Sequence, residues 1–170
     1  MKNNPLSAFL FIFMAMFFLA GCVGYRLGST LPPDIKTVYV PIFANKSREP
    51  LIENDATAAA IAELQKDGTL KVVNAESADV ILECILTGVS LNPLRYDRSD
   101  VTKPNEYRLT LSASFTLKRV RDQEMLCEAS VIGEATFPFV GNLTSAKQSA
   151  MPRASEDLAK RIVERAVEAW

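Results

Sequence analysis

The segment from Tyr107 to Lys118 constrains the fold most, because apolar and polar side chains alternate along it without a break. Strict alternation predicts a β-strand that packs one face on a hydrophobic core and turns the other face toward water. A polar connection from Arg119 to Gln123 follows, and then a second strand-like segment from Glu124 to Phe137. These segments predict a β-hairpin within an antiparallel sheet.

The chain before this hairpin predicts a strand and a helix. Residues 35–43 are rich in β-branched side chains, and Pro41 implies that this strand lies at a sheet edge or ends nearby, because proline cannot donate to a ladder. A helix is expected next, which Asn54 or Asp55 caps and Gly68 closes. Its apolar residues recur three and four apart and predict one buried stripe, made of Ala56, Ala60, Ile61 and Leu64.

Two further strands and a C-terminal helix complete the predicted fold. Residues 69–73 form a short strand, and residues 79–91 form a longer one whose two apolar phases predict a central strand covered on both faces. The last helix is expected near Met151, with weaker helical character from Ser145, because Pro152 suits a first turn and not a helix interior. The order predicts an α+β two-layer sandwich, with a mixed, largely antiparallel sheet of four to five strands and two helices on one face.

The N-terminus resembles the signal peptide of a bacterial lipoprotein. Lys2 precedes an apolar run over residues 8–20, and the motif Leu19-Ala20-Gly21-Cys22 matches a lipobox. As a helix this run rises about 20 Å, less than the roughly 30 Å hydrocarbon core, so a cleaved leader fits better than a spanning helix. An ordinary buried cysteine at the end of a hydrophobic helix is the alternative. The predicted organisation is a leader over 1–21, a lipidated tether over 22–33 and one domain over 34–170.

Lipidation at Cys22 changes the expected membrane relation from spanning to anchored. A cysteine thiolate is a strong nucleophile that a lipid group can alkylate, and two or more acyl chains make a stable anchor. In enterobacteria an aspartate after the cysteine tends to retain such a protein in the inner membrane. Val23 stands there in this chain, which favours the outer membrane.

Composition excludes several classes of function. The chain has no histidine, so Ser-His-Asp and Cys-His catalytic arrangements and His-liganded zinc or iron sites cannot form. Losing the leader removes one of 19 basic residues and none of the 20 acidic ones, so no basic bias supports nucleic-acid binding. Lysine or carboxylate bases remain formally possible, but no pair stands out. We expect a protein that is not an enzyme and carries no cofactor beyond the lipid on Cys22.

Four segments carry a resemblance to a known family. Residues 22–27 read CVGYRL and residues 31–46 read LPPDIKTVYVPIFANK, while NEYRL at 105–109 and IVER at 162–165 are similar as well. These segments resemble the LptE family, outer-membrane lipoproteins of lipopolysaccharide assembly. Val23 departs from the Cys-Gly-Tyr order of many relatives and lengthens the tether.

The resemblance implies a function that involves no catalysis. LptE-like proteins sit inside the lumen of the β-barrel translocon LptD, help it to assemble and support delivery of lipopolysaccharide to the cell surface. The implied location is the periplasmic side of the outer membrane. The alternative is an adaptor or activator of another envelope machine such as a peptidoglycan synthase, since the segment at residues 38–47 also fits modules of that kind.

A polar strand face is the candidate for contact with a partner. It would suit a wet lumen, although a sheet face turned toward water is commoner. Neighbouring strands leave Ile81, Ile85, Leu126 and Ile132 outside the helix layer, so we expect a partner to cover part of this face. The candidate partner-facing residues are Thr110, Ser112, Ser114, Thr116, Ile81 and Ile85.

Cations near the predicted loop at residues 92–105 are candidates for lipid A phosphates, because guanidinium groups bind phosphate in bidentate geometry. The alternative is a solvated loop with local Arg–Asp pairing, and a second basic cluster at Lys118, Arg119 and Arg121 is expected to be solvated. The candidate lipopolysaccharide-binding residues are Arg95, Arg98, Lys103 and Arg108.

Cys84 and Cys127 are expected as two buried free thiols. A meander would place them two strand spacings apart, roughly 9.6 Å, whereas a disulfide needs Cα atoms within about 7 Å.

Overall fold

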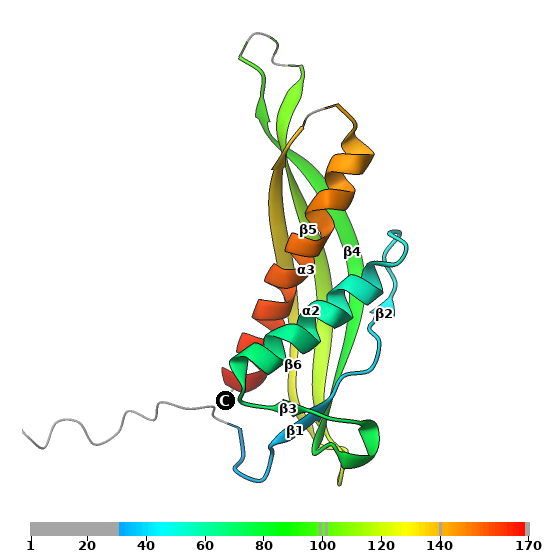
Figure 1. The fold of residues 1–170 in the computed structure, drawn as a ribbon, viewed down its shortest axis with the longest axis vertical. Coiled ribbons are helices and arrows are strands. Elements are labelled where there is room, and N and C mark those ends of the chain that lie inside the picture. The colour runs from blue at the N-terminus through cyan, green and yellow to red at the C-terminus, as the bar shows by residue number, and fades with distance from the viewer. Residues whose placement is uncertain (1–30, 99, 101, 140, 169–170) are drawn as a thin grey trace, which may run out of the picture.

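The computed structural model describes residues 31–98, 100, 102–139 and 141–168. Its elements are β1 (Thr37–Tyr39), β2 (Ala44–Asn45), α2 (Ile52–Asp67), β3 (Lys71–Val72), the short 3-10 helix η2 (Ala75–Ser77), β4 (Val80–Tyr96), β5 (Pro104–Arg119), β6 (Met125–Pro138) and α3 (Leu143–Glu168). The sheet order is β3-β1-β4-β5-β6, and β2 pairs with β4. Both helices lie on one face of this mixed sheet (Figure 1), which confirms the predicted α+β sandwich. The leader, Cys22, the tether as far as residue 30 and Trp170 lie outside the described residues.

Strands β4, β5 and β6 form the long central part of the sheet, and β5 confirms the predicted alternation. Every second residue of β5 from Leu109 to Leu117 is buried, whereas the residues between them are only half-buried. β5 pairs antiparallel with β4 on one side and with β6 on the other. The predicted hairpin between β5 and β6 is therefore confirmed.

The connection between β4 and β5 is much shorter than predicted. The expected loop from Asn92 to Asn105 is wrong, because β4 continues to Tyr96 and β5 already begins at Pro104. Register shifts on both sides of Arg95 interrupt the ladder, and such bulges tolerate a proline within a strand pair. The end of β4, the start of β5 and the short connection between Tyr96 and Pro104 extend past the helix layer (Figure 1). This extension is called the arm, and the connection is its tip.

Only one face of β4 is covered, so the prediction of burial on both faces is wrong. Val80, Leu82, Cys84 and Leu86 are buried under the helices, whereas Ile81 and Ile85 on the other phase are only partly buried. Both helices pack on the same side, so the described elements supply no layer for the second face. Leu126, expected outside the helix layer, is buried instead. A register shift opposite Leu117 and Lys118 leaves it as an extra residue in β6, and it joins the core.

The predicted strand over residues 35–43 is broken into β1 and β2 on either side of Pro41. β1 lies between β3 and β4, so it is not an edge strand, and it ends before Pro41 as the other alternative stated. The Asp79 carboxylate fastens β1 to the start of β4. It accepts the backbone N–H groups of Lys36 and Thr37 at 2.9 Å each and the Thr37 hydroxyl at 2.8 Å. Hydrogen bonds from Lys36 and Thr37 hold the pKa of Asp79 below its ordinary value.

Helix α2 begins earlier than predicted. Asn54 and Asp55, expected as caps, lie inside its first turn because the helix starts at Ile52. The preceding residue, Leu51, has φ of 65° and makes no side-chain cap hydrogen bond. Gly68 closes the helix as predicted, in a left-handed conformation with φ of 77°.

Helix α3 also begins earlier than predicted, at Leu143 instead of near Met151, so Pro152 lies inside it. Asn142 supplies the N-cap, since its side-chain oxygen accepts two backbone N–H groups of the first turn at 2.8 and 3.3 Å. Ala150 and Met151 are buried just before the proline. Tertiary packing of this turn therefore outweighs the hydrogen bond that the proline removes.

Cys84 on β4 and Cys127 on β6 are buried free thiols, as predicted. They flank β5, where their strand partners are Phe115 and Leu117. Burial raises the pKa of Cys84 to about 12 and also raises that of Cys127. Both thiols therefore stay protonated and unreactive at neutral pH.

Helix α3 lies directly on the backbone of β6 at Gly133. A Cβ at this position would meet the carbonyl oxygen of Ala154 and would lie 2.5 Å from the backbone nitrogen of Leu158. The same closeness lets Asp157 Oδ2 accept the backbone N–H of Glu134 at 2.9 Å. Gly133 therefore sets the distance between the helix layer and the edge of the sheet.

Replacing this glycine tests that contact. Gly133→Ala is expected to lower the free energy of unfolding by about 2–3 kcal/mol, because α3 must move away from β6. Urea denaturation of the purified protein measures the change. Gly88→Ala is the matched control, since apart from its two chain neighbours no described residue lies within 4 Å of an added Cβ there. Equal urea midpoints for the two variants would show that α3 does not rest on the strand backbone.

Candidate partner-binding face and arm

The face of β4, β5 and β6 that points away from the helices is called the open face. Cross-strand pairing places Ser114 between Ile85 and Ser130, and Ser112 opposite Ile132. The open face therefore brings together all of the predicted partner-facing residues: Thr110, Ser112, Ser114 and Thr116 on β5, and Ile81 and Ile85 on β4.

A lane of hydroxyl side chains along β5 is thus bordered by isoleucines. The hydroxyl residues are half-buried between the neighbouring strands, while Ile132 is 45% exposed. Single isoleucines among hydroxyls offer both apolar contact and hydrogen bonds. Such a mixture suits a protein surface or a wet lumen better than lipid tails.

Ion pairs stand at both ends of the open face. Lys118 Nζ lies 2.7 Å from a Glu83 carboxylate oxygen at one end. At the other end Arg108 lies 3.7 Å from Glu134, and the Arg108 Nε is buried without a hydrogen-bond partner among the described residues. The open face therefore carries charge at its ends and little charge in its middle.

The arm carries the predicted lipopolysaccharide-binding cations, and most of them are paired. Arg95 Nε lies 3.1 Å from Glu106, across the strand pair. Lys103 Nζ lies 3.1 Å from Asp100 at the tip, while Arg98 is exposed. Arg95 and Arg108 share the open face near the base of the arm, whereas Arg98 and Lys103 lie in the tip, so the four cations form two groups.

The Arg95–Glu106 and Lys103–Asp100 ion pairs on the arm have cations that are well exposed to solvent. The side chains of Arg95 and Lys103 are each 78% exposed, so these ion pairs exchange readily with other anions. At the tip the Thr102 hydroxyl and then Lys103 hydrogen-bond to Asp100 and hold the pKa of its carboxyl below the ordinary value. Local pairing at the tip is thus between Lys103 and Asp100 and not the Arg–Asp pairing of the alternative, while Arg95 pairs with Glu106 of the neighbouring strand.

An aromatic group that the sequence pattern did not predict lies at the base of the arm. Tyr107 stacks on Phe137 and meets Phe139 edge-on, with ring centroids 6.0 Å apart in both contacts. Phe139 is 37% exposed, and Tyr96 further along the arm is 47% exposed. The alternation of β5 already marks Tyr107 as core-facing, but only the strand register places it opposite Phe137.

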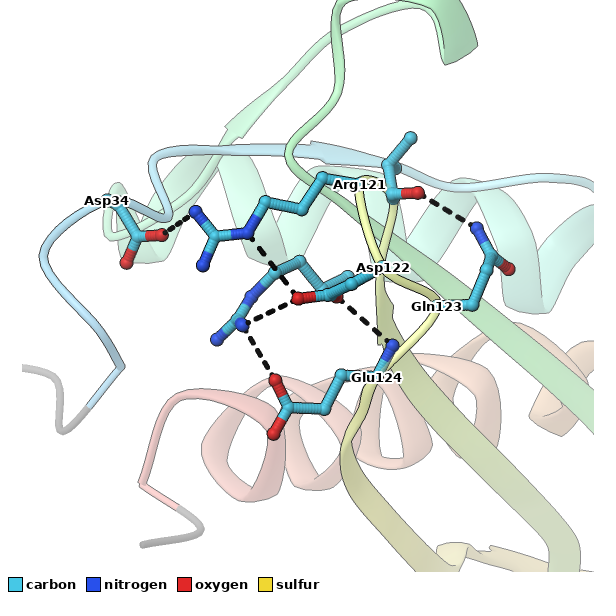
Figure 2. A network of polar contacts seen from close by, with 7 residues as sticks. Asp34, Arg121, Asp122, Gln123 and Glu124 are labelled. Carbon is cyan, nitrogen blue, oxygen red and sulfur yellow. Dashed lines mark hydrogen bonds and ion pairs between the residues drawn. The ribbon is translucent and has the colours of Figure 1, made fainter.

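The second basic cluster, at the turn between β5 and β6, is neutralised by acids (Figure 2). Arg119 lies 2.6 Å from Glu124 and 3.2 Å from Asp122. Arg121 reaches Asp34 at 3.0 Å and so ties the turn to the segment that follows the predicted tether. Each cation of this cluster is thus paired with a carboxylate, since Lys118 also pairs with Glu83.

Two further features bear on function. In the described part of the chain, neither helix is long and apolar enough to cross a membrane. Among the same residues, no group of three or more histidine, cysteine, aspartate or glutamate side chains is placed to hold a metal ion.

Comparisons with solved structures show the fold. A hypothetical protein of Chlamydia trachomatis is similar with a TM-score of 0.54 and 9% identity, covering 78% of this chain and 95% of that one. A protein of Xanthomonas campestris has a TM-score of 0.52 and 12% identity, covering 80% and 88%. The minor lipoprotein of Acinetobacter baumannii has a TM-score of 0.52 and 12% identity, covering 78% and 93%. At these identities the likeness is one of fold alone.

Comparison with curated proteins finds no match. A family model does match: the LptE model, described as lipopolysaccharide-assembly, covers residues 35–166. That range includes every described strand and nearly all of both helices. The chain therefore belongs to the LptE family of lipopolysaccharide-assembly proteins.

Proposed function

We propose that this chain is an outer-membrane lipoprotein, anchored on the periplasmic side through lipid on Cys22, that sits inside an LptD-type β-barrel translocon. In this role it helps the barrel to assemble and supports transport of lipopolysaccharide to the cell surface. It acts by binding and not by catalysis. Membership of the lipopolysaccharide-assembly family supports this proposal.

The open face is the observation that carries the proposal. The helices cover one side of the sheet, and the described chain has no second layer for the other side. A lumen wall lined with polar side chains is a suitable cover for a lane of hydroxyls bordered by isoleucines. Thr110, Ser112, Ser114, Thr116, Ile81 and Ile85 are the proposed contacts.

The sequence also supports the anchor. The lipobox places Cys22 nine residues before the first described residue, Leu31. The Asp34–Arg121 ion pair joins the start of the predicted domain to the β5–β6 turn. The membrane end of the molecule is thus proposed to be the end that carries the β5–β6 turn, with the arm at the opposite end (Figure 1).

The arm is the proposed contact for lipopolysaccharide. Lipid A phosphates would exchange with the carboxylates that now pair with Arg95, Lys103 and Arg108, and would also meet the exposed Arg98. A phosphate binds guanidinium in the same bidentate manner as a carboxylate, with more charge. Competition with the chain's own acids would keep the contact weak enough for release.

Association with the barrel is tested by a charge on the open face. Ser114→Arg in the full-length chain is expected to reduce recovery of the barrel at least tenfold on purification from solubilised outer membranes, because a guanidinium would be desolvated in the contact. Ala58→Arg, exposed on α2, is the matched control and should recover the barrel normally. Undiminished recovery with Ser114→Arg would contradict the proposed contact. Recovery of a peptidoglycan synthase in place of the barrel would favour the adaptor alternative.

Lipopolysaccharide binding is tested by changing the acids as well as the cations. Glu106→Gln is expected to tighten binding several-fold, because it frees Arg95 for phosphate. Arg95→Ala combined with Arg98→Ala should weaken it about tenfold, and added salt should reduce both effects. Titration of the purified variants with fluorescent lipopolysaccharide measures these changes. Identical affinities across the series would exclude the arm as the binding site.

A further inference from the structure

Strand β6 forms a long edge of the sheet, and the direction of its backbone groups is known. Phe139, just beyond β6, donates its N–H to the carbonyl oxygen of Asn105 at 2.9 Å. The backbone N–H groups of odd-numbered residues in this part of β6 therefore point toward β5. Glu134 instead donates its N–H outward, to Asp157. Because strand residues alternate, the N–H groups of Ser130 and Ile132 also point outward.

These outward groups open onto a groove beside α3. The groove has a volume of about 420 Å³ and is lined by Ser130, Val131, Ile132, Arg161, Glu164, Arg165 and Glu168. No residue of the described chain accepts a hydrogen bond from the N–H of Ser130 or Ile132. The groove therefore combines unpaired backbone donors with enough room for another chain.

Other parts of this edge are protected, which makes the gap more notable. Proteins normally block their edge strands, because an open edge pairs with any available strand. In β6 the Asp157 carboxylate, itself held by Arg161 at 3.0 Å, occupies the N–H of Glu134. A bulge at Leu126 interrupts the strand near its start. The unprotected stretch is thus limited to Glu128–Ile132, with a stop at each end.

We propose that an extended segment of a partner protein adds to β6 along Glu128–Ile132 as a further strand of the sheet. Main-chain hydrogen bonds would supply affinity, and alternate side chains would supply specificity. The open-face phase of this stretch presents Glu128, Ser130 and Ile132. The segment therefore carries a lysine or arginine opposite Glu128, which forms no ion pair within the described chain, and a β-branched or aromatic residue beside Ile132.

A second copy of this chain fits the edge less well than a different partner. Two-fold pairing over Glu128–Ile132 would centre on Ser130 and set Glu128 of one copy opposite Ile132 of the other, because Asp157 already occupies the N–H of Glu134. A second copy would therefore offer Glu128 no cation, whereas opposite charges directly across a strand pair stabilise it. The charge pattern of β6 thus favours a basic segment from another protein.

A photo-crosslinking residue in place of Arg165, on the helix wall of the groove, tests the proposal in the full-length chain in its native membrane. Irradiation is expected to give one adduct, whose crosslinked site by mass spectrometry lies in an extended segment carrying a basic residue. Ser130→Pro should reduce this adduct at least tenfold, because it removes an outward N–H and none of the bonds to β5. Ser130→Ala keeps that N–H and should leave the adduct unchanged.

A second variant guards against misfolding of the proline variant. Glu128→Lys changes an exposed side chain and should reduce the adduct about fivefold through charge repulsion alone. An adduct that persists in both Ser130→Pro and Glu128→Lys would overturn the proposal. So would an absence of any adduct, an adduct with a second copy of this chain, or a crosslinked site within a helix. Barrel recovery with Ser114→Arg reports on a different strand, so the two proposals can fail separately.

Discussion

The contact of α3 with the backbone of β6 decides which surfaces of this protein are covered. Because Gly133 has no side chain, the helix comes close enough for Asp157 to bind the N–H of Glu134. α3 then packs against α2 and fills the helix layer on one side of the sheet. Residues 31–168, as far as the structure describes them, place no layer on the other side. The open face and the unprotected edge both result from this one-sided packing.

Charges are distributed in a way that fits this arrangement. At the base, the largely buried Arg119 pairs with Glu124 and Asp122, so its charge is already satisfied within the chain. At the arm, the ion pairs of Arg95 and Lys103 are mostly exposed and cost little to exchange. This distribution fits the proposal of attachment at one end, contact with a partner in the middle and lipid recognition on the arm.

Much of the fold was predictable from short-range pattern, and the errors share one physical cause. The alternation from Tyr107 to Lys118 and the closing Gly68 report local chemistry, and both predictions are confirmed. Pro152 inside α3 could not be predicted, because burial of the turn before it outweighs the local cost of the proline. The same holds for Pro93 within the arm, where a bulge absorbs it. Contacts between residues far apart in the sequence decide each of these cases, so the neighbouring residues alone could not predict them.

The candidate site also has a part that local sequence predicts and a part that depends on tertiary structure. Ser112 and Ile85 could be assigned to one face from strand phase alone, but the acids that pair with Arg95 and Arg108 lie across strands and depend on register. The edge groove depends on where a helix rests and has no sequence signal at all.

The central claim is that the open face is covered in the native membrane. Labelling of Ser112→Cys with a membrane-impermeant maleimide tests it, against the low background of the buried Cys84 and Cys127. The account predicts rapid labelling of the purified protein and strong protection in intact outer membranes. Equal labelling rates in the two preparations would contradict it.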